Sequence, residues 1–216
     1  MYNRLLTVVY DPGLGGEFLA WVLGQNESYV PTSVYVNSNN RWRMVDGKST
    51  PFHVIDEWNG EATIDQSQFH FHPDQINISR DHMFYFHPDS TWDDKLVKKF
   101  VNDKCDIWNE SCIIVLRSLT LESHEYFKNI RNKKLNLGNA LRPSFDDMNE
   151  RLDRQLHVLD EVDVLVIDPY DLFITNTTTT MKEISVWSEK IFGINAVIDI
   201  DTMKFFINIW RSNNII

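Results

Sequence analysis

The sequence has little cysteine. Only two cysteines, Cys105 and Cys112, occur among its 216 residues. They are too few for a disulfide-based scaffold of this length, and their spacing fits no zinc motif. No apolar run approaches the roughly 20 residues that a membrane helix needs. The N-terminus leads into a short apolar run without a small-residue cleavage site, which we interpret as a strand. We therefore expect a cytoplasmic protein with reduced thiols and no membrane partner.

Basic residues are also scarce. The chain carries 21 Lys and Arg against 31 Asp and Glu, which gives a formal net charge of -10. Such a surface repels the phosphates of nucleic acids, so we expect no nucleic-acid partner. Any phosphate site must therefore be built locally, from backbone amides and a few arginines. The hydrophobic share of 43% supplies a full core, and we expect residues 1–216 to form one domain.

Compact apolar segments alternate with helical patterns along the chain. The predicted strands cover residues 5–10, 83–86, 112–116 and 162–167. The predicted helices cover residues 17–23, 91–101, 119–130, 144–159, 180–192 and 201–210, with capping boxes at 144–147 and 180–183. This order predicts a three-layer α/β/α fold with a central, mostly parallel sheet. Residues 28–80 are irregular and β-like, with a predicted hairpin around 37–40 and a second turn signal at 46–47, and we interpret them as an insertion beside the main sheet.

A glycine-rich turn follows the first predicted strand. Gly13, Gly15 and Gly16 allow the backbone to approach an anion closely, and the amides of the next helix would point at it. The nucleotide-kinase pattern requires Gly-Lys-Ser/Thr, but Glu17 and Phe18 follow the last glycine, and the dinucleotide pattern requires a glycine in place of Phe18. Glu17 suits a helix N-terminus but would repel a bound phosphate. A tight β–α turn without a ligand stays open as an alternative.

Four segments occur in an order that resembles a known family. They are the strand and turn at 8–19, the Phe-His-Pro at 86–88, the strand at 113–117 with a serine at 123, and the segment at 164–173 with a helix end at 191–193. This layout is similar to that of the sulfotransferases, P-loop-fold enzymes that use 3′-phosphoadenosine 5′-phosphosulfate. The turn lacks the Lys or Arg and the Ser or Thr of that family. The separation in sequence between Arg117 and Ser123 is also shorter than the separation between the corresponding Arg and Ser in the family.

The resemblance implies an activity and the residues that carry it. A sulfuryl group would move from 3′-phosphoadenosine 5′-phosphosulfate to a hydroxyl of a small-molecule or carbohydrate acceptor, with no metal. His87 would accept the hydroxyl proton. Arg117 and Ser123 would hold the 3′-phosphate of the donor, with Ser118 as an alternative to Ser123 and with Arg142 or the basic residues at 131–134 adding charge. The turn would hold the 5′ side of the donor through Gly13, Leu14, Gly15, Gly16, Glu17 and Phe18.

Two other functions stay open. The missing loop Lys and Ser/Thr favour a protein that binds a nucleotide or anion without catalysis, a relic of the P-loop fold that serves as an interaction module. The second alternative is a metal-dependent hydrolase, because His70 and His72 fall on one face of an extended segment, a common ligand spacing, and His82 and His87 follow. No carboxylate-histidine helix motif accompanies these histidines.

Overall fold

The structure of the protein is a computed structural model. It describes residues 4–10, 14–31, 44–45, 48–49, 75–81, 110–135, 144–158, 162–193, 196 and 198–214. The predicted strand at 83–86, the predicted helix at 91–101 and the predicted hairpin around 37–40 lie outside the described residues.

A five-stranded sheet forms the centre of the fold. Its strands follow the order β2-β5-β1-β6-β7, and every neighbouring pair is parallel. The strands are β1 (Arg4–Tyr10), β2 (Tyr29–Pro31), β5 (Ile76–Asp81), β6 (Glu110–Leu116) and β7 (Asp163–Ile167). A separate antiparallel pair, β3 (Met44–Val45) and β4 (Lys48–Ser49), flanks the predicted turn at 46–47. The central strand β1 therefore runs between β5 and β6, deep inside the protein.

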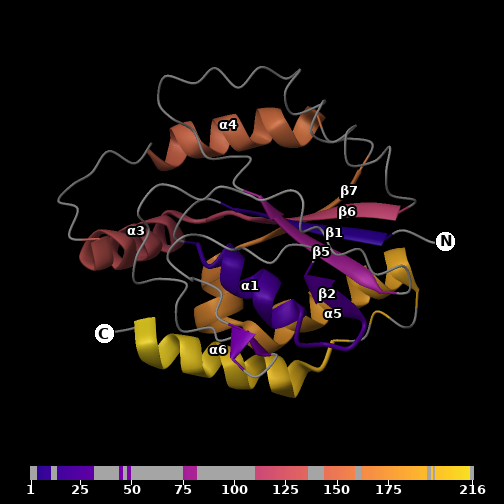
Figure 1. The fold of residues 1–216 in the computed structure, drawn as a ribbon. Helices are drawn as coiled ribbons and strands as arrows, with labels where there is room; N and C mark the ends of the chain where they lie inside the picture. Colours follow the sequence, from indigo (N-terminus) through magenta and orange to yellow (C-terminus); the bar gives the residue numbers. More distant parts are fainter. Residues whose placement is uncertain are drawn as a thin grey trace.

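Helices cover both faces of this sheet. The helical elements are α1 (Gly16–Leu23), α3 (Leu121–Leu135), α4 (Phe145–Val158), the π-helical turn η3 (Asp171–Thr175), α5 (Thr177–Phe192) and α6 (Ile200–Asn214). Figure 1 shows α1, α5 and α6 on one face and α4 on the other. The α/β fold with a parallel sheet between two helical layers is thus confirmed. No described helix is long and apolar enough to cross a membrane.

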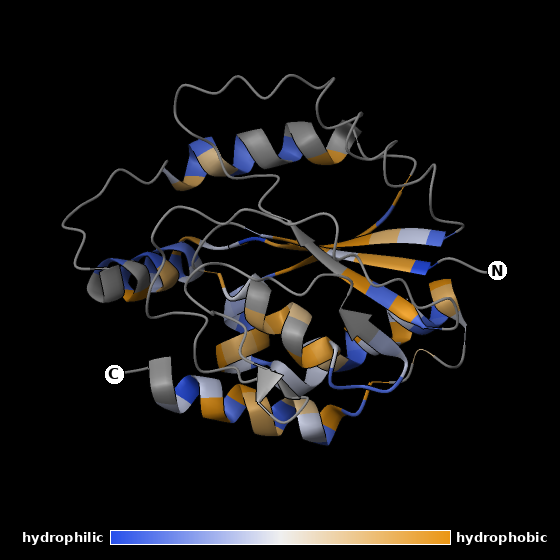
Figure 2. Cartoon of the chain, in the orientation of Figure 1, coloured by the Kyte–Doolittle hydropathy of each residue, from blue (hydrophilic) through white to orange (hydrophobic). Residues whose placement is uncertain are grey.

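The side chains of the central strands alternate between the two faces of the sheet. The even-numbered residues of β1 and β6 belong to one core cluster with α1, α5 and α6: Leu6, Val8, Tyr10, Cys112, Ile114 and Leu116. The odd-numbered residues Leu5, Val9, Ile113 and Val115 are equally buried but lie outside that cluster, because successive side chains of a strand point to opposite faces. Burial on both faces explains why residues 5–10 and 112–116 are apolar apart from Thr7 (Figure 2).

Most predicted elements that fall on described residues are present. β1, α1, β6, α3, β7 and α6 agree with the sequence patterns within a few residues. The predicted box at the start of α4 is confirmed, since the Ser144 hydroxyl accepts from the Asp147 amide at 3.1 Å. The box at 180–183 is wrong, because α5 begins at Thr177 and Thr180 is buried within its first turn. Residues 28–80 also differ from the expectation, since they contribute β2 and β5 to the main sheet.

Candidate functional site

The path of the chain singles out the carboxyl ends of β1 and β6. From β1 the chain passes through α1 to β2, on one side of the sheet, whereas from β6 it passes through α3 and α4 to β7, on the other side. Right-handed crossovers in opposite directions place the connecting helices on opposite faces, as Figure 1 shows for α1 and α4. The two chain segments therefore diverge after β1 and β6. In open α/β sheets, ligands bind in the crevice at such a point.

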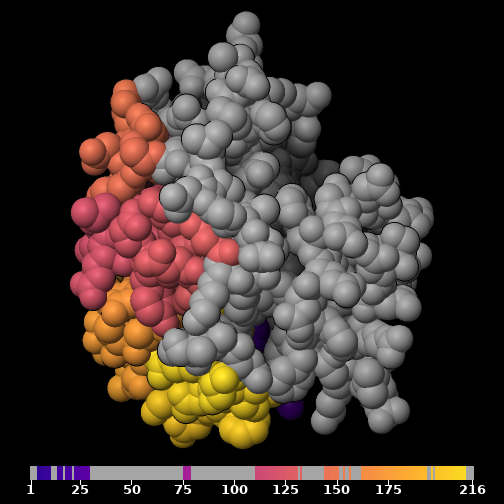
Figure 3. All heavy atoms as spheres, turned by 90° about the vertical axis from the view of Figure 1, so that its left-hand side faces the viewer, coloured from indigo at the N-terminus to yellow at the C-terminus, as the bar shows by residue number. Residues whose placement is uncertain are grey.

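Figure 3 faces this edge of the molecule. There α3 lies between α4 and the pair formed by α5 and α6. The loop from Arg117 to Thr120 joins β6 to α3. β7 ends beside β6, because Leu116 is paired with Ile167. The residues that follow β1, β6 and β7 consequently lie along one edge.

The turn glycines have a packing role. Gly15 adopts a φ of 79° at the N-cap of α1, a left-handed conformation, and a Cβ there would lie 2.7 Å from the ring of Phe173. At Gly16, a Cβ would lie 2.0 Å from the ring of Tyr10. Close packing of α1 on β1 and η3 thus requires both glycines without any ligand. Gly13 lies outside the described residues.

The apolar residues of the turn anchor it to the core. Leu14 and Phe18 are each 1% exposed, and the Phe18 ring packs against those of Phe173 and Trp210 at centroid distances of 6.0 Å. Their side chains therefore hold the turn in place and are not available to a ligand. The backbone amides of the turn, unlike these side chains, are available to a ligand. No described residue accepts a hydrogen bond from the amide of Gly16 or of Glu17. These first amides of α1 are the groups that an anion would use.

Arg117 extends from the end of β6 toward α4. Its guanidinium donates to the Asp153 carboxylate at 2.7 Å and to the side-chain Oδ1 of Asn149 at 2.9 Å. The arginine side chain is 12% exposed, whereas that of Asp153 is 66% exposed. The cation predicted to bind the donor is thus present at the expected edge, where α4 holds it.

Ser123 takes part in a different network, centred on a buried carboxylate. Asp168, directly after β7, is 6% exposed and accepts hydrogen bonds from the Ser123 hydroxyl at 2.5 Å and from the amides of Leu119 and Tyr170 at 2.8 Å each. This network joins the β6–α3 loop to the start of η3. Arg117 and Ser123 therefore bond to separate partners and do not converge on one open site.

A further cation, Arg211 of α6, was missed by the sequence reasoning. It donates to the carbonyl oxygens of Phe173 and Ile174 and to the Thr177 hydroxyl, so it caps the end of η3. Burial lowers the pKa of its guanidinium. Its position in the last turn of α6 does not indicate this contact in the sequence, because only the tertiary fold brings α6 to η3.

The histidines predicted to act as a base or as metal ligands are not among the described residues. His87, the predicted base, and His70, His72 and His82, the predicted metal ligands, all lie outside them. Within the described ranges, no group of three or more His, Cys, Asp or Glu side chains is placed to hold a metal ion. His124 of α3 is described but is buried, with its ring 5.7 Å from that of Phe145.

Comparison with known proteins yields little. No family model and no curated protein matches the sequence. One similar solved structure is the unliganded crystal structure of a sugar kinase from Janibacter sp. HTCC2649, at 13% identity, over 91% of this chain and 99% of the kinase. Its TM-score of 0.38 is too low to carry an argument about fold or function. The fold class therefore rests on the strand order and the helical layers, and the function on the site.

Proposed function

We propose that this chain binds the phosphate-bearing part of a nucleotide at the carboxyl ends of β1 and β6 and acts as a P-loop-type transferase. The observation that carries the proposal is the divergence of the chain after these adjacent strands, with the first turn of α1 beginning there. The amides of Gly16 and Glu17, without described acceptors, supply donors for an anion.

The specific reaction that we propose is sulfuryl transfer. The acceptor hydroxyl oxygen attacks the sulfur of 3′-phosphoadenosine 5′-phosphosulfate in line, and the bond from sulfur to the phosphate oxygen breaks. Adenosine 3′,5′-bisphosphate leaves, and His87 accepts the hydroxyl proton. The backbone over Gly13–Phe18 holds the 5′ side of the donor, and Arg117 and Ser123 hold its 3′-phosphate. The acceptor is a small molecule or a carbohydrate.

This role requires Arg117 and Ser123 to exchange protein partners for the donor. Releasing Arg117 breaks an ion pair with an exposed carboxylate, and such pairs contribute only about 0–1 kcal/mol. Releasing Ser123 removes a donor from the buried carboxylate of Asp168, which costs about 1–3 kcal/mol. Recruitment of Arg117 also breaks its hydrogen bond to Asn149.

A second function is an anion-binding module without catalysis. It is favoured by the turn at residues 11–17, which contains none of the Lys, Ser or Thr residues that a catalytic P-loop uses. The existing partners of Arg117 agree with it as well. Under this alternative, the donor product binds but no sulfuryl group is transferred.

Calorimetric titration with adenosine 3′,5′-bisphosphate separates these possibilities. The wild-type chain should bind it, and Arg117→Gln should weaken binding by about tenfold, the loss of one charge-assisted contact. Arg4→Gln is the matched control, because Arg4 lies at the opposite end of β1 and pairs with Glu110 at 3.5 Å. Absence of wild-type binding would overturn both functions.

Turnover is then measured as release of adenosine 3′,5′-bisphosphate from 3′-phosphoadenosine 5′-phosphosulfate with hydroxyl acceptors, both carbohydrates and small molecules. His87→Ala should lower the rate by about 10²–10⁴-fold and leave the affinity for the product unchanged. Binding without turnover across the acceptors would instead establish the module.

A further inference from the structure

Ser118 carries a buried hydroxyl without a partner. The residue lies two positions after the end of β6 and is 0% exposed, and its Oγ has no hydrogen-bond partner in the described structure. Ser123, five residues further on, bonds to Asp168. Buried polar groups are almost always paired, so an orphan hydroxyl in a native protein requires an explanation.

Strand alternation places Ser118 on the same face of the sheet as α1. Tyr10 and Leu116 are directly paired and share the core cluster with α1, and the Tyr10 ring lies against Gly16, the first residue of that helix. Ser118 is two residues beyond Leu116 and so falls on the same face, one step past the end of the strand. Arg117 falls on the opposite face, in agreement with its bonds to α4.

The orphan hydroxyl thus falls on the face of the sheet that α1 covers, and the amides of Gly16 and Glu17 at the start of that helix have no described acceptors. The turn itself has no serine or threonine between Tyr10 and Phe18. We propose that Ser118 supplies this missing hydroxyl from the neighbouring strand and donates it to a phosphate- or sulfate-type group held at the N-terminus of α1. The inference rests on the proposed function and adds a binding residue to that site.

The buried carboxylate of Asp168 does not prevent anion binding there. Asp168 follows β7, on the side of β6 away from β1, and three donors already surround it. An anion at the start of α1 lies on the β1 side of β6. Because Ser118 is closed to solvent, binding requires the surrounding chain to open by at least the size of one anion oxygen.

Ser118→Ala tests the proposal through two readouts. Removal of an unpaired buried hydroxyl should leave the unliganded melting temperature unchanged or raise it. The same change should weaken binding of adenosine 3′,5′-bisphosphate by about tenfold, which is the loss of one hydrogen bond to a charged group. Ser188→Ala is the matched control, since Ser188 is also 0% exposed but lies in α5, near Tyr29 at the start of β2. It should leave the affinity unchanged.

Failure of the proposed function and failure of the role of Ser118 give different results. If the wild-type chain does not bind the bisphosphate, the proposed function fails and the role of Ser118 fails with it. If the wild-type chain binds and Ser118→Ala binds equally well, only the role of Ser118 is overturned. A fall in both affinity and unliganded stability in Ser118→Ala also counts against the proposal, because the hydroxyl would then have a structural partner.

Discussion

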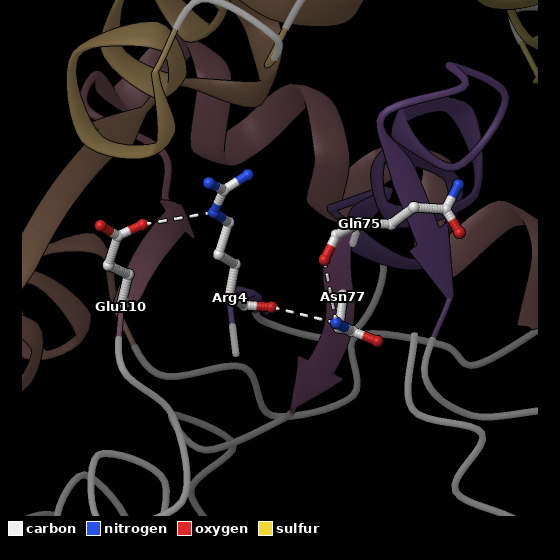
Figure 4. A network of polar contacts seen from close by, with 4 residues as sticks. All are labelled: Arg4, Gln75, Asn77 and Glu110. Atoms are coloured by element: carbon white, nitrogen blue, oxygen red, sulfur yellow. Dashed lines mark hydrogen bonds and ion pairs between the residues drawn. The ribbon is translucent and has the colours of Figure 1, made fainter. Parts of the chain in front are cut away.

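Polar side chains at the two ends of the parallel sheet have different kinds of hydrogen-bond partner. At the amino end, polar side chains bond mainly to adjacent strands, since Arg4 pairs with Glu110 at 3.5 Å and the Asn77 amide donates to the carbonyl oxygens of Arg4 and Gln75 (Figure 4). At the carboxyl end, Asp168 and Arg117 bond across loops and to helix α4.

The difference shows where the fold leaves room for a ligand. Neighbouring strands fix the amino-end network, and it has few ways to rearrange. The carboxyl-end network depends on loops, has an exposed partner in Asp153, and includes the unpaired hydroxyl of Ser118. Binding groups that must exchange partners are therefore expected at the carboxyl end.

The largest effect is expected from Asp168→Ala. The change removes the acceptor of the buried Ser123 hydroxyl and of two partly buried backbone amides. We expect the free energy of unfolding to fall by about 3 kcal/mol, because a buried donor left unpaired costs about 1–3 kcal/mol and a partly buried one costs less. Urea denaturation followed by circular dichroism measures the loss.

Asn77→Ala is the matched change at the amino end, where a fully buried side chain donates to two carbonyl oxygens. It should cost about 1–2 kcal/mol, because it removes two hydrogen bonds but leaves no charged group unpaired. Asp168→Asn, which keeps one acceptor oxygen, should fall between the two alanine variants. Equal losses for Asp168→Ala and Asn77→Ala would break the comparison between the two ends.

An intermediate effect is expected from alkaline pH at the amino end. Tyr29, at the start of β2, is 2% exposed, and burial raises the pKa of its hydroxyl to about 12. The unfolded chain loses that proton near pH 10. The contribution of the protonated Tyr29 hydroxyl to the free energy of unfolding is therefore complete below about pH 10. It disappears as the pH rises to about 12, a loss on the order of 2 kcal/mol.

Tyr29→Phe should remove most of this decline in unfolding free energy, as measured by urea denaturation between pH 9 and pH 12. The variant should also lose about 1 kcal/mol at neutral pH, because the hydroxyl donates to the Ala196 carbonyl oxygen at 3.2 Å. Tyr170→Phe, at the carboxyl end, should change the decline little, since that ring is only partly buried. An unchanged decline in Tyr29→Phe would exclude Tyr29 as its source.

The smallest effect on stability is expected from Asp153→Asn. It weakens the ion pair with Arg117, but the carboxylate is 66% exposed, so the loss should stay below about 1 kcal/mol. The same change should strengthen binding of adenosine 3′,5′-bisphosphate by a few fold in calorimetry, because Arg117 is released.

Glu110→Gln is the corresponding change at the amino end. It breaks the pair with Arg4, where both side chains are 27% exposed, and should leave binding unchanged. If Asp153→Asn and Glu110→Gln affect binding equally, Arg117 has no special role at the carboxyl end.

The fold was largely predictable, because its core strands carry their own signal. Residues 5–10 of β1 and 112–116 of β6 are buried and almost entirely apolar, and residues 164–167 of β7 are apolar although only Ile167 is fully buried, so these runs are visible without any structure. β2 and β5 were missed. β2 has three residues, and β5 alternates polar and apolar residues as Ile76-Asn77-Ile78-Ser79, so neither forms an apolar run.

The candidate site was predictable in position but not in its contacts. The rule that ligands bind after the carboxyl ends of parallel strands indicated the segments that contain Arg117, Ser123 and Asp168. The pairing of Ser123 with Asp168 spans 45 residues and that of Arg117 with Asp153 spans 36. Local patterns contain no information on contacts at such separations.

The sequence by itself determined the layered α/β architecture, because hydrophobic periodicity and helix caps act over a few neighbouring residues. It also determined that a glycine-rich turn follows the first strand. Only the tertiary structure decided why Gly15 and Gly16 are glycines, since the rings that approach them come from η3 and β1. The same holds for the partners of Arg117 and for the isolation of the Ser118 hydroxyl, because hydrogen bonds between distant segments exist only after the chain has packed.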